Sequence, residues 1–243
     1  MHDRRLVTEG IRVSRIFPKN SRQIAAALGL GVVLFGGLIT AGVTYYFTPK
    51  YTRVGYTPYQ PVPYSHRIHA GQLGLDCTYC HTNVFESPHA NLPSPNVCMN
   101  CHDPAKGNIK GDSPLLAPIR DAFKTGRPVD WVKVHKVPDF AYFNHQIHVN
   151  RGVSCVSCHG RVDQMVEVRH EQPLSMSWCL DCHRNPEPNL RPNELVTKLD
   201  WDSAKDWKVS PLTQNTDSQE AFARKMVKVS ALHPPTNCTT CHR

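Results

Sequence analysis

The sequence predicts a mainly irregular fold with short α-helices, plus one N-terminal transmembrane helix. Three observations carry this prediction: a 24-residue run without charge, five copies of one cysteine motif, and a composition poor in apolar residues. Of the 243 residues, 40% are hydrophobic and only 8% aromatic, with 20 Pro and 10 Cys. This composition excludes a coiled coil, a collagen-like chain and full disorder. We therefore expect something other than side chains to fill the centre of the fold.

The uncharged run extends from Ile24 to Phe47. As a helix it would measure about 36 Å, enough to cross a hydrocarbon core of about 30 Å. Residues 1–23 carry six basic and two acidic side chains, so the positive-inside rule predicts a cytoplasmic tail and an external, periplasmic position for the rest of the chain. A cleaved signal peptide is the alternative, but the run is longer than the usual apolar region of such a peptide and no A-x-A site follows it.

After the helix, residues 48–64 form a Pro/Tyr-rich strap. It cannot make a long helix, because proline lacks the N–H group and clashes with the preceding turn. Residues 65–243 are the predicted external domain, with modules at 65–104 and 143–186 and a C-terminal part at 217–243.

Short helices are expected at each cysteine motif, and strands are expected to be scarce. Two further helices are predicted, over Pro114–Lys124 with Gly126 near its end and over Ser218–Val229 with Asp217 as N-cap and Glu220 three residues on.

All ten cysteines belong to five C-x-x-C-H motifs, the attachment pattern of c-type haem. Two thiols one helical turn apart can add to the two vinyl groups of a porphyrin, and the adjacent His then binds the iron. Disulfides need no His after each pair, and zinc or iron–sulfur sites lack this repeated adjacent His. The sequence thus predicts five covalently bound haem c groups, whose porphyrins are the core. The attachment residues are Cys77, Cys80, Cys98, Cys101, Cys155, Cys158, Cys179, Cys182, Cys238 and Cys241, and the proximal ligands are His81, His102, His159, His183 and His242.

The motifs form an internal repeat. Successive first cysteines are 21, 57, 24 and 59 residues apart, so motifs one and two pair, motifs three and four pair, and motif five stands alone. An H-x-x-H pair precedes the first motif of each module, and its two His can each reach a different ring. The predicted distal ligands are His66, His69, His145 and His148, with His135 preferred for the fifth iron, Met176, Met165 and His89 as further candidates, and His233 as a weak one.

Two protein ligands on an iron leave no position for a substrate, so electron transfer without catalysis is the expected role. The membrane helix holds no charged or His side chain, so any proton movement would belong to partner proteins. A nucleic-acid partner is excluded despite the net charge of +8, because the domain is expected outside the cytoplasm and contains no basic run.

The longer phrases around the motifs resemble the pentahaem cytochrome c subunit of bacterial alternative complex III, over nearly the whole chain. The phrases that carry this resemblance are PYSHRIHAG (63–71), VCMNCH (97–102), WVKVH (131–135), YFNHQIHVN (142–150) and PLSMSWCLDCHRNP (173–186).

The resemblance implies class III-like haem modules in a subunit of a membrane-bound quinol:electron-acceptor oxidoreductase. The implied partners are an iron–sulfur subunit related to molybdopterin enzymes, polytopic quinol-binding subunits and a monohaem cytochrome c subunit. Electrons would pass from quinol to a periplasmic cytochrome c, a copper protein or a terminal oxidase. The resemblance also allows one His/Met iron, which keeps Met176 and Met165 as candidates. His170 departs from the pattern, where Gln is more usual, so no ligand role is carried onto it.

Two other classes of function remain as alternatives. A membrane-anchored quinol dehydrogenase of the tetrahaem type would oxidise quinol itself, so the isolated chain would accept electrons from quinol directly. A catalytic multihaem reductase would contain one high-spin iron, whereas a pure relay predicts five low-spin irons.

Overall fold

A computed structural model describes residues 17–47, 53–207, 216, 218–229 and 231–242. The chain divides into two compact units, Met1–Thr48 and Pro49–Arg243. Most of the predicted cytoplasmic tail, the first residues of the predicted strap, and the predicted N-cap Asp217 lie outside the described residues.

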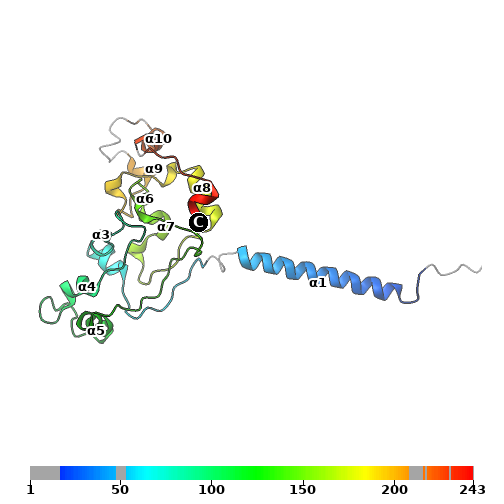
Figure 1. The fold of residues 1–243 in the computed structure, drawn as a ribbon, viewed down its shortest axis with the longest axis horizontal. Coiled ribbons are helices and arrows are strands. Elements are labelled where there is room, and N and C mark those ends of the chain that lie inside the picture. Colours follow the sequence, from blue (N-terminus) through cyan, green and yellow to red (C-terminus); the bar gives the residue numbers. More distant parts are fainter. Residues whose placement is uncertain (1–16, 48–52, 208–215, 217, 230, 243) are drawn as a thin grey trace, which may run out of the picture. The chain divides into compact units, whose positions relative to one another are not determined.

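The first unit contains one long helix, α1 (Ser21–Phe47), drawn in blue in Figure 1. An 18-residue window of this helix has a mean hydropathy of 2.2, so the helix is long and apolar enough to cross a membrane. One of its polar side chains is satisfied within the helix, since Thr40 Oγ1 donates to the Gly36 carbonyl at 2.8 Å. The predicted apolar helix is thus confirmed, with three additional residues at its N-terminal end.

The second unit consists of short helices joined by long irregular segments (Figure 1). Among the residues that the structure describes there is no strand, and one isolated antiparallel bridge joins Val153 and Leu190. The predicted fold class is therefore confirmed. The helices are α3 (Cys77–Cys80), α4 (Pro95–His102), α5 (Ala117–Thr125), α6 (His145–Val149), α7 (Cys155–His159), α8 (Met176–Arg184), α9 (Ser203–Asp206), α10 (Gln219–Val229) and α11 (Cys238–Cys241), with a π-helical turn η1 (Arg67–Gln72) and the 3₁₀ turns η2 (Pro114–Leu116), η3 (Val162–Gln164), η4 (Glu187–Asn189) and η5 (Asn193–Leu195).

The two helices predicted apart from the motifs are present. The first is the pair η2 and α5, and it ends at Gly126, whose φ of 70° is the left-handed conformation that glycine adopts most readily. The second is α10, at whose start the Ser218 hydroxyl accepts a hydrogen bond from the Ala221 amide at 3.2 Å. Ser218 therefore supplies a side-chain cap at this end.

Side-chain packing forms three small apolar clusters within the described residues. Their buried members are Leu190, Trp201, Phe222 and Met226 in the first cluster, Val62, Met99 and Ile119 in the second, and Val84, Val149 and Val196 in the third. Each cluster is much smaller than the single core expected for a domain of this length. Side chains of the described residues thus pack in separate small clusters, as expected if another group fills the centre.

The described part of the strap, residues 53–64, is attached to the rest of the second unit by hydrogen bonds. Gly55 and Tyr56 exchange backbone hydrogen bonds with His170 at 2.8 and 3.0 Å. The Gln60 side chain both donates to the Val132 carbonyl and accepts from the Val132 amide, each at 2.9 Å. These contacts hold an extended segment without a strand partner of its own.

Candidate haem-binding sites

Each cysteine motif lies on a short helix that begins at or shortly before its first cysteine. In three of them the preceding residue caps the helix: Asp76, Ser154 and Asn237 accept hydrogen bonds from Thr78, Val156 and Thr240 amides. A capped single turn brings the two cysteines onto adjacent turns of one face, which is the spacing that haem attachment needs. None of the ten cysteines forms a disulfide.

The two H-x-x-H pairs lie on equivalent turns, η1 and α6, and each is preceded by an aromatic residue. The Tyr64 ring stacks on His69 at 4.4 Å and meets His66 edge-on at 4.8 Å. Phe143 makes the same two contacts with His148, at 4.4 Å, and with His145, at 4.8 Å. The sequence repeat is thus a structural repeat, in which one aromatic ring fixes the orientation of two imidazoles.

Three pairs of imidazoles lie at the spacing of two ligands on one metal. An imidazole nitrogen binds a first-row metal at about 2.0–2.1 Å and lies about 1.2 Å from its ring centre, so two rings on opposite sides of one metal have centroids roughly 6.4 Å apart. The observed centroid distances are 6.2 Å for His69 and His102, 6.4 Å for His145 and His159, and 6.1 Å for His148 and His183. In each pair one ring belongs to a distal candidate and the other to a proximal candidate, so the spacing fits a haem iron between them.

Hydrogen bonds to the main chain leave the Nε2 atom of many of these imidazoles available. A Nδ1–H group that donates to a carbonyl fixes the tautomer and places the lone pair on Nε2, the usual arrangement of metal-ligating histidine. Seven imidazoles pair Nδ1 with a backbone carbonyl: His69 with Ser65, His81 with Asn91, His102 with Ile109, His145 with Pro88, His148 with Asn144, His183 with Pro235, and His242 with Phe140.

Burial keeps several imidazoles neutral, the form that binds iron. It lowers the pKa of His66 to about 4, of His135 to about 4 and of His159 to about 3. Burial also lowers the pKa of His145 and His148, partly offset by their hydrogen bonds to Pro88 and Asn144. Since a charged imidazole has no lone pair on either nitrogen, this environment favours ligation over protonation.

His66 and His81 are the remaining distal and proximal candidates of the first module. Burial lowers the pKa of His66, and the charges of His81 and His69 act in the same direction. The Nδ1 atom of His66 is buried without a hydrogen-bond partner. By the pattern of the second module, the first His of the pair faces the first motif and the second His faces the second motif.

His135 occupies a different environment from the other distal candidates. Its ring meets His159 edge-on at 4.3 Å, a centroid distance too short for an intervening iron, and stacks on His170 at 5.2 Å. Its Nε2 atom is buried without a hydrogen-bond partner. His170 is fully buried, and burial lowers its pKa. The structure thus brings His135 to the third motif, and its assignment to the fifth iron stays a prediction.

The remaining candidates differ in exposure. Met165 is buried, whereas the side chain of Met176, at the start of α8, is 67% exposed. His89 and His233 are both exposed. On the fifth motif, the ring contact of His242 is with Phe140, at 5.7 Å. Among the described residues, no histidine ring is paired with His242 in the way seen at motifs two to four.

Comparison with known proteins gives two matches. Residues 62–114 match the family model described as cytochrome c7 and related cytochrome c. A second match, 31% identical over 100 residues, is the menaquinone reductase multiheme cytochrome c subunit of Nitratidesulfovibrio vulgaris. The second unit contains a multihaem cytochrome c domain, in which the family match covers the first two motifs. The alignment covers 41% of this chain and 45% of the relative, so the chain spans less than half of that protein.

Several residues of the cytochrome domain escaped the sequence reasoning. The carbonyl groups that accept from the histidines carry no sequence signal, because every residue has one. The capping residues Asp76, Ser154 and Asn237 do carry a sequence signal, since each is a residue type that favours a helix N-cap and directly precedes the first cysteine of a motif. Tyr64 and Phe143 occupy matching places in the repeat, and that match was the available signal for their shared role.

Proposed function

We propose that the chain carries five covalently bound haem c groups and relays electrons from quinol oxidation, as a subunit of an alternative complex III-type quinol:electron-acceptor oxidoreductase. The acceptor would be a periplasmic cytochrome c, a copper protein or a terminal oxidase. The observation that carries this proposal is the opposition of imidazoles at 6.1 to 6.4 Å. When bound, haem c supplies reversible one-electron oxidation and reduction at its iron.

The residues of the domain then have distinct tasks. The cysteine pairs hold each group covalently, and the following histidines bind from one side. His69, His145 and His148 bind from the other side, and His66 is proposed to do the same at the first motif. Ligands on both sides exclude a substrate, so these residues support a relay and oppose catalysis.

Rigid placement of the ligands is the second requirement of a relay. Carbonyl acceptors and the rings of Tyr64 and Phe143 hold the imidazoles in one orientation, so little rearrangement accompanies a change of charge. The fifth ligand set is proposed to include His242 and one of His135, Met176 or Met165.

The membrane assignment rests on α1. We propose that it is retained as a single-pass anchor, with the haem domain on the outer face of the cytoplasmic membrane. The name of the relative, a subunit of a menaquinone reductase, supports a quinone-linked membrane complex. An iron–sulfur subunit, polytopic quinol-binding subunits and a monohaem cytochrome c are the proposed partners.

Purification in mild detergent tests the proposal. The expected result is co-migration with a large iron–sulfur protein and polytopic membrane subunits, with five haems per chain by pyridine haemochrome assay and all irons low-spin. An isolated chain that quinol reduces directly would instead support the tetrahaem-type quinol dehydrogenase. A high-spin iron that binds nitrite or sulfite would support a catalytic reductase.

A further inference from the structure

Motifs one and two are neighbours within the first module. The Asn100 side chain of motif two donates to the Tyr79 hydroxyl of motif one at 3.0 Å. The Tyr64 ring contacts both His66 and His69, the distal candidates for these two motifs.

Motif one is joined to motif three by hydrogen bonds on both sides of a short segment. The joint is the pair Val196 and Thr197, which lies between the two helices α3 and α7. The Thr197 hydroxyl donates to the Asp76 carboxylate at 2.9 Å, and its carbonyl oxygen lies 3.8 Å from the Cys77 sulfur. The Val196 carbonyl accepts from the Ser154 hydroxyl at 2.7 Å and from the Cys155 amide at 3.4 Å.

The same segment of chain joins motif three to motif four. Asn189 donates to the Cys182 sulfur at 3.6 Å. Two residues further on, the Arg191 amide donates to the Gly152 carbonyl at 2.9 Å, just before motif three. A Cβ atom at Gly152 would lie 2.4 Å from the Arg191 carbonyl oxygen, so this approach depends on glycine.

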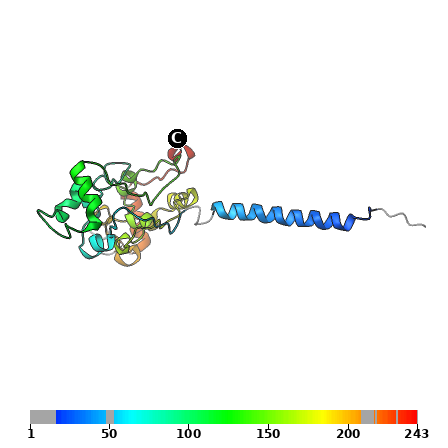
Figure 2. The same ribbon diagram turned by 90° about the horizontal axis from the view of Figure 1, so that it is seen from below.

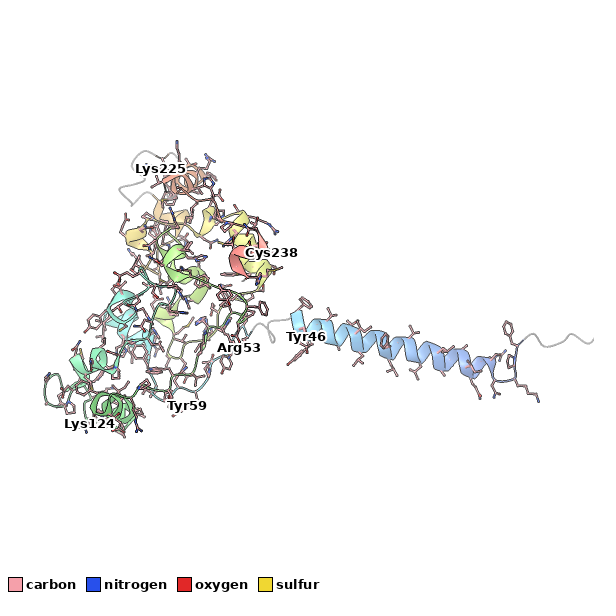
Figure 3. All side chains as sticks on the ribbon, viewed as in Figure 1. Tyr46, Arg53, Tyr59, Lys124, Lys225 and Cys238 are labelled. Atoms are coloured by element: carbon pink, nitrogen blue, oxygen red, sulfur yellow. The ribbon has the colours of Figure 1, made fainter. Side chains whose placement is uncertain are left out.

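Motif four is joined to motif five through His183, which pairs with the Pro235 carbonyl at 2.6 Å, three residues before Cys238. Figures 1 and 2 agree with this series: α4 and α5 lie at one end of the domain, and α8 and α11 lie toward the other. In Figure 3, Lys124 of α5 and Cys238 of α11 are far apart on the same domain.

We propose that the motifs follow the spatial order two, one, three, four, five, so that the first module is traversed against the direction of the chain. The inference deepens the proposed relay and rests on it. The second and fifth motifs are then the two ends, from which partner proteins are reached. Motif one, the first in the sequence, is an internal position with a neighbour on each side.

Two matched variants of the full-length protein in its complex test this order. His69→Met and His66→Met each replace one imidazole by a thioether, which raises the potential of one identified iron. The charge on an iron shifts the reduction potential of its nearest neighbours most strongly. In a spectroelectrochemical titration, the number of other one-electron steps whose potential changes therefore equals the number of neighbouring haems. The expected result is one other shifted step for His69→Met and two for His66→Met. The reverse result, two for His69→Met and one for His66→Met, would show that the spatial order follows the sequence and would overturn the proposal.

If either variant fails to retain its haem, the wild-type complex gives the same answer by electron cryo-microscopy. The iron of motif one must lie between those of motifs two and three, and an iron of motif two in that middle position overturns the proposal. Both measurements are independent of the electron source. If the haems follow this order but quinol is not the source of their electrons, only the proposed function is refuted.

Discussion

Gly71 is the position where a single methyl group should disturb one ligand most directly. It lies on η1, two residues after His69, and a Cβ atom there would be 2.2 Å from the carbonyl oxygen of Asp163. Asp163 cannot yield easily, because its carboxylate accepts two hydrogen bonds from Arg161 at 2.7 and 2.9 Å. Ordinary carbon contacts begin near 3.4 Å, so Gly71→Ala must move η1 by about 1 Å.

The energetic and spectroscopic consequences follow from that displacement. Overpacking of this kind costs about 1–3 kcal/mol, which lowers the melting temperature of a domain of this size by roughly 2–10 °C. Because the same shift draws His69 away from His102, about one fifth of the proposed low-spin haem should become high-spin.

Calorimetry and low-temperature electron paramagnetic resonance measure the two effects. Gln72→Ala is the matched control, since Gln72 is exposed on the same turn, and it should leave both unchanged. A Gly71→Ala protein with wild-type melting and a wild-type low-spin signal would refute the argument that this close approach positions His69.

Three further predictions concern other parts of the cytochrome domain. His148→Ala should convert one haem, that of motif four, to high spin in the magnetic circular dichroism spectrum, whereas His89→Ala should not; equal spectra would contradict the pairing with His183. Phe222→Ala, at a side chain only 1% exposed, should cost about 3–5 kcal/mol of stability in thermal unfolding, and the exposed Leu115→Ala serves as its control. Ser154→Ala removes the buried donor to the Val196 carbonyl, so it should cost about 1–3 kcal/mol and speed hydrogen exchange at Cys155; Ser177→Ala should do neither.

The chemistry of the domain could be predicted from the sequence because it depends on local spacing. Two cysteines separated by two residues fit one helical turn, and the structure places each cysteine pair on a helix, with His81 and His242 directly after the helix end in motifs one and five. The apolar run from Ile24 likewise predicts α1 from composition alone. These features need no information about distant residues.

Pairing of the imidazoles could not be predicted, because it depends on residues far apart in the chain. His69 faces His102 across 33 positions of sequence, and the spacing alone allowed either His of a pair to serve either ring. His135 illustrates the same limit: its sequence neighbourhood made it a candidate for the fifth iron, but tertiary packing places its ring against His159. The joint at Val196 and Thr197 has no motif at all.

The use of main-chain carbonyls as hydrogen-bond acceptors bears on how the domain tolerates mutation. A side-chain carboxylate behind a ligand can be lost by one substitution, and it would add a negative charge beside each iron. The carbonyls of Ser65, Pro88 and Pro235 survive replacement of their own side chains as long as the backbone keeps its path. Loop sequences can therefore drift while the orientation and basicity of each imidazole are inherited unchanged. Selection would then act on the backbone path of these loops and constrain the identity of few of their side chains.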